Sequence, residues 1–180
     1  MNRTTRTTSS WGYGLQQSLR GSFTARAHGL LKTQFTLLDT GGREFGRLRL
    51  RGLSVAEFES GDYAVILEKS GVSYRMVADG EEVLAATPRG RSIDELVISC
   101  GGRTYEARAS FFRNLAIASY RKDGKRVARV TGGLMSRSYE ALFDAEDECA
   151  IPVAVFLLWH VAANRRHAYR MWSPAGGGAM

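Results

Sequence analysis

Apolar and polar residues alternate in short segments from Ser22 to Phe143, and glycine or Asp-Gly separates many of these segments. Alternation with a period of two, together with frequent aromatic and β-branched residues, predicts half-buried β-strands. We expect about twelve of them, near residues 22–28, 31–38, 44–51, 53–60, 62–68, 72–78, 82–88, 93–100, 103–111, 115–121, 126–131 and 135–143.

Turns of similar composition join these segments. Asp39-Thr40-Gly41-Gly42, Asp79-Gly80 and Asp123-Gly124 each stand between two alternating runs and recur about 40 residues apart. Asp-Gly favours type I′ turns, in which both central residues need a positive φ. The repeat therefore predicts consecutive antiparallel hairpins. Propeller blades are the competing arrangement, but the WD and kelch signatures are missing from the sequence.

The last apolar stretch, Cys149 to Ala163, has almost no polar position, so it predicts a helix that is buried on all sides, in protein or in lipid. Acidic residues precede it and arginines follow it, as the helix dipole favours, and Pro152 falls in the first turn, where its missing N–H costs little. A bilayer needs about 20 apolar residues, and His160 would be costly in lipid. We expect a core helix near residues 149–166. A tail-anchored membrane helix is the alternative.

The strands and the helix fit one architecture. Closing the sheet removes the edge strands, and a closed barrel of this size is too wide to be filled by its own side chains. The apolar helix would fill it. We therefore predict a mainly β protein, a closed antiparallel barrel of about twelve strands that encloses a C-terminal α-helix. The barrel domain would span residues 22–167, between a disordered or loosely docked segment at 1–21 and a tail at 168–180.

Three motifs carry a resemblance to a known family: LLDTGGREFGRLRL, YRKDGKRVARV and YEALFDAEDECAIPVAVFLLWHV. A strand-rich chain with such Asp-x-Gly hairpins, followed by an acidic-to-apolar helix, resembles the tubby C-terminal-like superfamily. The LURP-one-related proteins are the nearest relatives by this resemblance, and the phospholipid scramblases are more distant. The resemblance implies a twelve-stranded barrel around a central helix. Similar proteins include phosphoinositide binders, which implies a phospholipid ligand.

The composition of the sequence indicates the charge of the protein surface and the cellular compartment of the protein. The chain has 180 residues and a net charge of +7, with 21 arginines and 4 lysines, so its surface attracts phosphates, although a GC-rich genome would produce the same arginine bias. The first ten residues have no apolar segment that would indicate a secretory signal. Cys100 and Cys149 form no metal or redox motif, and we expect two buried thiols. These features predict a cytoplasmic protein, peripheral at the membrane where it binds lipid.

The first candidate site is a row of three arginines: Arg47, Arg49 and Arg51. Their spacing of two places all three on one face of a predicted strand. Like charges in a row repel one another unless an anion neutralises them, and a guanidinium group can bind two phosphate oxygens at once. The alternative is an exposed strand face that is neutralised by acids on neighbouring strands, such as Glu57, Glu59 or Glu68.

A second group of five cations surrounds the Asp123-Gly124 turn: Arg121, Lys122, Lys125, Arg126 and Arg129. If the barrel brings this group near the arginine row, the two together would form an anion site of headgroup size. Solubility is the alternative explanation. Four acids before the helix, Asp144, Glu146, Asp147 and Glu148, could hold calcium, but the D-x-D-x-D-G loop is missing and helix capping explains them.

Signals of catalysis are missing from the sequence. No serine or cysteine stands in a nucleophile elbow, no spacing suits a metal, and no glycine-rich phosphate loop opens a helix. His160 lies inside the apolar helix, where a hydrogen-bonded core histidine is expected. We therefore predict no catalytic residue, metal or cofactor, and no enzyme.

The function that we expect is a non-enzymatic, monomeric binding module for an anionic ligand, namely phospholipid or phosphoinositide headgroups at a membrane surface. Nucleic acid is an alternative partner because of the basic charge, although no RNP-like strand or recognition helix is visible in the sequence. A tail-anchored or scramblase-like membrane protein is the third possibility.

Overall fold

The computed structural model describes residues 15–16, 18–29, 31–61, 63–133 and 135–172, and side chains up to residue 165. The expectations for residues 1–14 and 173–180 lie outside the described residues. The described elements are β1 (Ser22–His28), β2 (Gln34–Leu38), β3 (Glu44–Leu50), β4 (Val55–Ser60), β5 (Tyr63–Ser70), β6 (Ser73–Ala78), β7 (Glu81–Pro88), β8 (Glu95–Cys100), β9 (Arg103–Ser110), β10 (Leu115–Tyr120), β11 (Arg126–Gly132), β12 (Ser138–Phe143) and α2 (Ala150–Trp172).

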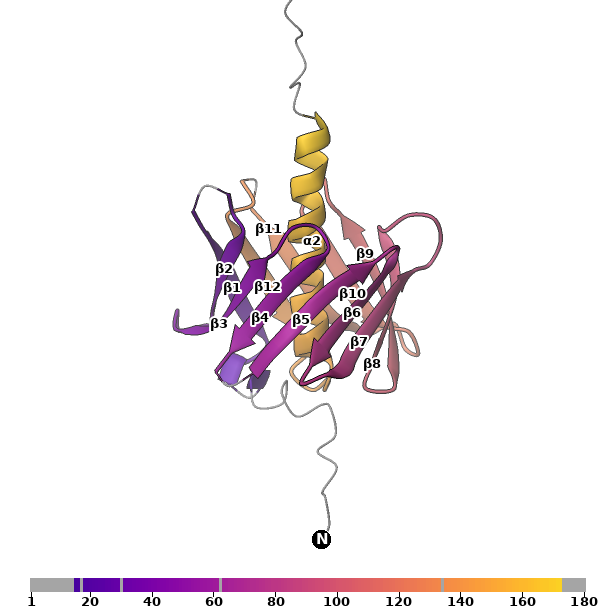
Figure 1. Ribbon diagram of the computed structural model, residues 1–180. Coiled ribbons are helices and arrows are strands. Elements are labelled where there is room, and N and C mark those ends of the chain that lie inside the picture. The colour runs from indigo at the N-terminus through magenta and orange to yellow at the C-terminus, as the bar shows by residue number, and fades with distance from the viewer. Residues whose placement is uncertain (1–14, 17, 30, 62, 134, 173–180) are drawn as a thin grey trace, which may run out of the picture.

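The twelve strands form one closed barrel (Figure 1). Each strand pairs antiparallel with the next, and β1 pairs with β12, with Phe23 opposite Ala141, so that the sheet has no edge. Each predicted strand overlaps one observed strand, and the predicted fold class is confirmed. The alternation of the sequence sets the two faces: on β4, Ala56, Phe58 and Ser60 are buried while the residues between them are more exposed.

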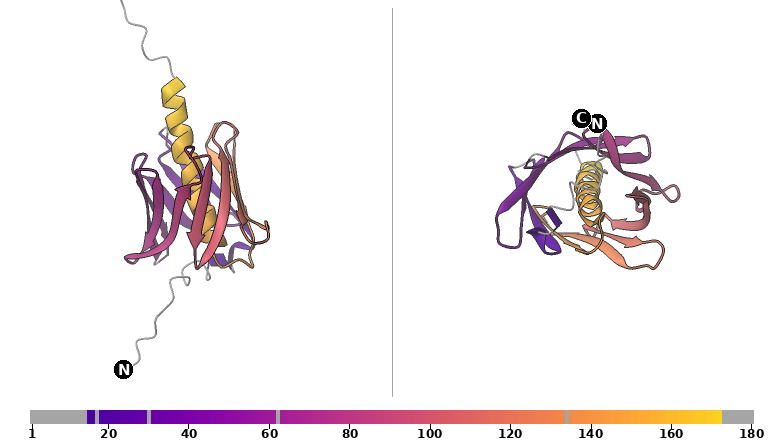
Figure 2. Two further views of the ribbon diagram at one scale, coloured as in Figure 1. Left: turned by 90° about the vertical axis from the view of Figure 1, so that its right-hand side faces the viewer. Right: turned by 90° about the horizontal axis from the view of Figure 1, so that it is seen from below.

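Helix α2 runs through the barrel, as the view along its axis in Figure 2 shows. Every residue from Cys149 to Ala163 is buried, including Phe156 and Trp159 at 0% and 1% exposure. A helix that is apolar on all sides is stable only where no side faces water. The barrel wall supplies that environment, and the prediction of a buried core helix is confirmed. Among the helices of the described part of the chain, we find none with the length and apolar character needed to span a bilayer.

Consecutive antiparallel hairpins place their turns alternately at the two ends of the barrel, so each end is formed by every second turn. We call one of these ends the exit rim: it is the end at which α2 leaves the barrel and continues beyond it (Figure 1). Two side chains of α2 bond to turns at this end. His160 Nε2 donates to Ile93 O at 3.0 Å, and Arg165 Nη1 donates to Phe111 O and Phe112 O at 3.0 and 3.1 Å. The exit rim comprises the described residues of the turns 29–33, 51–54, 71–72, 89–94, 111–114 and 133–137.

The opposite end is called the entry rim, because the chain passes through it from β12 into α2. It comprises the described residues of 18–21, 39–43, 61–62, 79–80, 101–102, 121–125 and 144–149. The described part of the N-terminal segment docks at this end. Leu19 is fully buried, and Gln16 Nε2 donates to Ala145 O at 2.7 Å and to Asp147 O at 2.6 Å. The described residues between 15 and 21 are therefore held more firmly than the sequence suggested.

The helix is longer than expected. It continues to Trp172, whereas the prediction ended it near residue 166 and began a tail at 168. The loss of apolar character after Ala163 marks where the helix leaves the barrel and not where it ends. The sequence has no helix-breaking residue until Pro174.

Replacing Phe156 with alanine tests the packing of the helix in the barrel. Phe156 is fully buried, so Phe156→Ala should lower the free energy of unfolding by about 3–5 kcal/mol, through lost apolar contact and a residual cavity. Phe112→Ala makes the same chemical change at a side chain that is 96% exposed, and it should cost less than about 0.5 kcal/mol. Urea denaturation of both variants measures the difference, and equal losses would contradict the buried position of α2.

Candidate functional site

The arginine row lies along the outside of β3, with Arg51 in the turn directly after the strand, and each of its members has a carboxylate partner. Arg47 Nε lies 2.5 Å from Glu44 Oε1, and this hydrogen bond raises the pKa of Arg47 above its ordinary value. Arg51 Nη2 lies 3.0 Å from Glu57 Oε2, and Arg49 Nη2 lies 4.0 Å from Glu59 Oε2. The row is therefore balanced by acids on β3 and β4. Of the acids named from the sequence, Glu68 pairs instead with Arg75, at 2.6 Å.

The second cationic group is mixed with acids at the entry rim. Arg121 pairs with Glu106 at 3.5 Å, and Lys125 Nζ lies 2.7 Å from Asp144 and 3.7 Å from Glu146. The hydrogen bond from Lys125 lowers the pKa of Asp144. Three cations of the group have no carboxylate partner within the described chain: Lys122, Arg126 and Arg129.

The structure does not bring the two groups together. In the barrel, β2, β1 and β12 lie between β3 and β11. At about 4.8 Å per strand, the two groups are about 19 Å apart along the wall. One lipid headgroup cannot contact both, so the expected combined anion site does not form.

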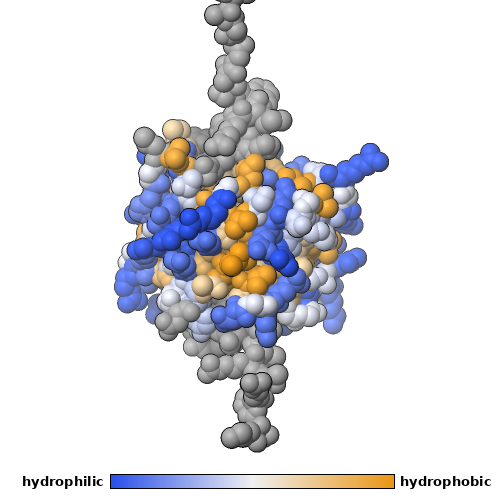
Figure 3. Space-filling model, in the orientation of Figure 1, coloured by the Kyte–Doolittle hydropathy of each residue, from blue (hydrophilic) through white to orange (hydrophobic). Residues whose placement is uncertain are grey.

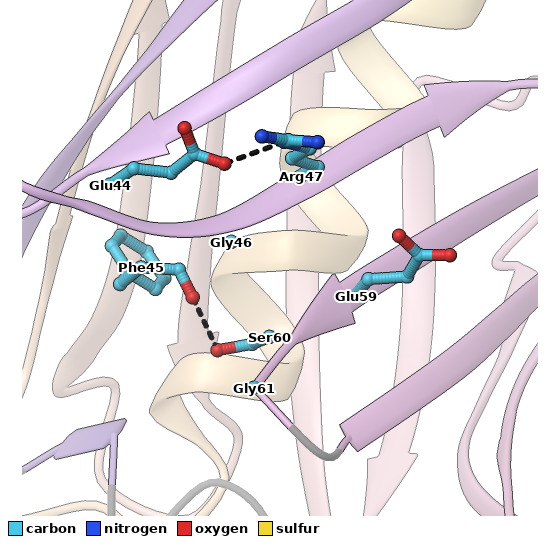
Figure 4. A pocket seen from close by; sticks show the side chains of 7 residues that line it. All are labelled: Glu44, Phe45, Gly46, Arg47, Glu59, Ser60 and Gly61. Atoms are coloured by element: carbon cyan, nitrogen blue, oxygen red, sulfur yellow. Dashed lines mark hydrogen bonds and ion pairs between the residues drawn. The ribbon is translucent and has the colours of Figure 1, made fainter.

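A pocket of about 330 Å³ opens beside Arg47, between β3 and β4, and it is lined by residues 44–47 and 59–61 (Figure 4). Glu44 and Glu59 outnumber the one guanidinium group in this lining, so the pocket would repel a phosphate. Ser60 Oγ donates its proton to Phe45 O at 2.6 Å, so this hydroxyl group does not offer a donor to an anion in the pocket. A Cβ atom on Gly46 would lie 2.8 Å from Glu59 O, so the strands approach closely here because the residue is glycine.

The acids before α2 serve the start of the helix. Asp147 is buried, and its Oδ1 atom accepts hydrogen bonds from the backbone N–H of Cys149 at 2.9 Å and from Tyr105 OH at 2.8 Å. Its Oδ2 atom lies 3.1 Å from Arg103 Nη1. Capping thus explains Asp147, as expected. Within the described residues, no group of three or more His, Cys, Asp or Glu side chains is arranged to hold a metal ion.

The two cysteines are free, buried thiols, as predicted. They lie close together: Cys149 Sγ is 2.9 Å from the position that a Cβ atom on Gly101 would take, next to Cys100. A hydrogen bond with Cys149, together with burial, raises the pKa of Cys100. Cys100 is therefore a protonated thiol of low reactivity at neutral pH.

His160 is a hydrogen-bonded core histidine, as predicted. It is 1% exposed, its Nε2 atom donates to Ile93 O, and its Nδ1 atom accepts from Asn164 Nδ2 at 3.2 Å. Both ring nitrogens are thus occupied in the neutral form. Burial lowers the pKa of His160 to about 4.

Charge is distributed unevenly between the two ends of the barrel. The described turns of the exit rim carry six cations and one acid: Lys32, Arg51, Arg89, Arg91, Arg113 and Arg137 against Asp94. The described entry rim carries five cations and seven acids: Arg20, Arg43, Arg121, Lys122 and Lys125 against Asp39, Asp79, Asp123, Asp144, Glu146, Asp147 and Glu148. One end is therefore strongly basic and the other is acidic.

Three arginines of the exit rim are exposed and have no carboxylate partner in the described structure: Arg91, Arg113 and Arg137. These three arginines do not cluster along the chain, so no local pattern in the sequence marks them as a site. The available signal was a different one, since each of the three lies in a turn that follows an odd-numbered strand.

The comparisons with known proteins bear on the fold. No protein-family model and no curated protein matches the chain. The structure is similar to the X-ray structure of a protein from Arabidopsis thaliana, with a TM-score of 0.55 and 11% sequence identity, over 79% of this chain and 93% of that chain. At this identity the similarity shows the fold alone. It supports the barrel and central helix implied by the resemblance to LURP-one-related and tubby-like proteins.

The Asp147 network predicts a stability difference between neighbouring acids. Asp147→Asn turns one buried acceptor into a donor that faces other donors, so it should lower the free energy of unfolding by about 1–3 kcal/mol. Glu148→Gln makes the same kind of change at an exposed side chain with no described partner, and it should be nearly neutral. Thermal or urea unfolding of the two variants checks this, and a neutral Asp147→Asn would contradict the capping role.

His160 predicts a pH dependence of stability. Its pKa in the folded state, about 4, lies below the ordinary histidine pKa of 6.5, so the unfolded state binds the proton more tightly. Its contribution is complete above pH 6.5, and the free energy of unfolding should fall by about 3 kcal/mol between pH 6.5 and 4. His160→Gln keeps a donor for Ile93 O and does not titrate. Urea denaturation across this range should show a smaller loss in the variant, and parallel curves would refute the assignment.

Proposed function

We propose that this protein is a non-enzymatic binding module for an anionic, phosphate-bearing surface, with phospholipid headgroups at a membrane as its ligand. The observation that carries the proposal is the separation of charge between the basic exit rim and the acidic entry rim. The resemblance to families that include phosphoinositide binders points in the same direction.

The direction of this charge separation matters for binding. An anionic leaflet attracts basic residues within about one Debye length, which is about 8–10 Å in physiological salt. Strands of five to eight residues keep the two rims roughly 20 Å apart. An approach with the exit rim first therefore brings cations within reach of the headgroups and keeps the acids of the entry rim outside it.

The exposed arginines also have suitable chemistry. A guanidinium group presents two parallel N–H donors to phosphate oxygens, and a partner carboxylate would compete for those donors. Arg91, Arg113 and Arg137 have no such competitor among the described residues, in contrast to the row on β3. This contrast favours the exit rim over the arginine row along β3 as the ligand-binding surface.

Among the described histidine and cysteine side chains, His28 alone is exposed, and its Nε2 atom is hydrogen-bonded to Thr36 Oγ1 at 2.6 Å. His160, Cys100 and Cys149 are 1%, 5% and 3% exposed, and the ring nitrogens of His160 are occupied by protein partners. None of the three faces solvent where a substrate could meet it.

Vesicle flotation with three charge variants tests the proposal. The exit-rim variant is Arg91→Ser/Arg113→Ser/Arg137→Ser, and the third variant is Arg47→Ser/Arg49→Ser/Arg51→Ser. The entry-rim control is Arg20→Ser/Lys122→Ser/Arg126→Ser, in which Arg126 is the adjoining first residue of β11. Each lowers the net charge by three. At roughly 1 kcal/mol per basic residue near an anionic surface, the exit-rim variant should bind phosphatidylserine-containing vesicles about 100-fold more weakly than the wild type.

The controls separate the candidate sites. The entry-rim variant should bind like the wild type, and phosphatidylcholine vesicles should bind none of the proteins. Loss of binding only in the third variant would return the site to the β3 row, and equal binding by all variants would refute a localised basic site.

Nucleic acid is the second candidate, because the same unpaired arginines could contact its phosphates. In that case affinity for duplex DNA should fall with salt, with a log–log slope near −0.9 per phosphate contacted. Retention of DNA but not of anionic vesicles at low salt would favour this function over the first.

A further inference from the structure

Large apolar side chains are exposed mainly at one end of the barrel. Eight are exposed among the described residues, and three of these lie on strands: Tyr63, Ile66 and Leu142. The other five lie in turns of the exit rim: Leu31, Leu53, Val72, Phe112 and Met135, at 73%, 45%, 64%, 96% and 68% exposure. None of the eight lies in the described turns of the entry rim.

The two rims provide an internal comparison. Both are built from short hairpin turns, and turns ordinarily use glycine, aspartate, asparagine and serine. The entry rim follows that rule with Asp39-Thr40-Gly41-Gly42, Asp79-Gly80 and Asp123-Gly124. The exit rim places an exposed apolar residue in five of its six turns. Turn formation does not require these side chains, so they need another explanation.

Their arrangement is a ring. The turns belong to five different hairpins, which follow one another around the barrel, and α2 leaves through the middle (Figures 1 and 2). In Figure 3, hydrophobic residues in orange appear at the upper edge of the barrel beside hydrophilic residues in blue. Exposed Arg113 directly follows Phe112, and Lys32 follows Leu31. Cations and apolar tips thus alternate on one surface.

We propose that the exit rim inserts its apolar turn tips into the headgroup and upper acyl region of an anionic bilayer, with the barrel axis near the membrane normal. This inference rests on the proposed function and adds the mode of contact and the orientation. Peripheral proteins bind anionic membranes by combining buried apolar area with basic charge, and the exit rim has both.

The projecting part of α2 is compatible with this orientation. Seven residues beyond Arg165 extend the helix by about 10 Å, which is the depth of the interfacial region. Its sequence contains Arg166, Tyr169, Arg170 and Trp172, and these residue types are common at membrane interfaces. A second copy of the chain is a poorer occupant of this surface, because two exit rims face to face would oppose their arginines.

A fluorescent probe at each rim tests the insertion. Phe112→Cys and Thr40→Cys place single exposed thiols on the exit and entry rims, while Cys100 and Cys149 are buried and should not label. The full chain is labelled with the environment-sensitive dye NBD and mixed with phosphatidylserine-containing vesicles. We expect a blue shift and a several-fold rise in emission for the probe at position 112, and no change for the probe at position 40. Labelled wild type is the blank.

Apolar variants give a second readout. Leu31→Ser/Phe112→Ser should weaken vesicle binding by roughly tenfold per inserted side chain. The control Ile66→Ser/Leu142→Ser removes two apolar residues that are also exposed, at 45% and 44%, but lie on the barrel wall, and it should bind like the wild type. Both pairs keep every charge, and thermal melts establish that each variant is folded.

The outcomes separate this inference from the function on which it rests. Binding that depends on Arg91, Arg113 and Arg137, with the probe at position 112 still in water, would overturn insertion and leave the anionic surface as the ligand. Insertion of the probe at position 40 would reverse the orientation and overturn the proposal. Absence of vesicle binding by the wild type would overturn both, and binding to a protein or nucleic acid instead would replace the bilayer as the partner.

Discussion

The structure depends on one interaction, the burial of an all-apolar helix inside a closed sheet. The part of α2 within the barrel has no polar face, so on its own it would expose apolar surface on every side. A closed sheet of twelve strands without the helix would enclose a space that its own side chains cannot fill. The helix fills the barrel and the barrel shields the helix, so each makes the other stable in water.

The same topology separates the two ends of the molecule. In an up-and-down barrel every second turn points the same way, so residues spread over the chain meet at one rim. Side chains at the entry rim stabilise the start of α2. Asp147 accepts hydrogen bonds from the backbone N–H of Cys149 and from Tyr105, and it forms an ion pair with Arg103. The acids cluster where the helix N-terminus favours negative charge. At the exit rim, α2 bonds to backbone carbonyl groups of the turns, at Ile93, Phe111 and Phe112, and the exposed arginines of these turns take no part in those bonds.

Much of the fold could be predicted from the sequence because its signals are local. Alternation with period two identified the strands, and apolar character on all sides identified a buried helix. The end of the helix was missed because Ala163 marks a change from buried to exposed environment, while the backbone continues to Trp172. The buried contact of Cys100 with Cys149, 49 positions apart in the sequence, depends on the registers of the whole barrel and has no local signal.

The candidate site was harder to predict, because a charge means little until its partners are known. Arg47, Arg49 and Arg51 looked like a site since they are adjacent on one face. Pairing with β4 places Glu59 opposite Arg47 and Glu57 opposite Arg49, and that arrangement neutralises the row.

Arg91, Arg113 and Arg137 looked unremarkable because each stands alone in the sequence. Only the closed topology shows that they share a rim, and only the described contacts show that no carboxylate competes for them. In this barrel, the excess of cations over acids therefore lies at the exit rim, because the turns alternate between the two ends. A basic patch on such a fold is better sought among every second turn than along any single strand.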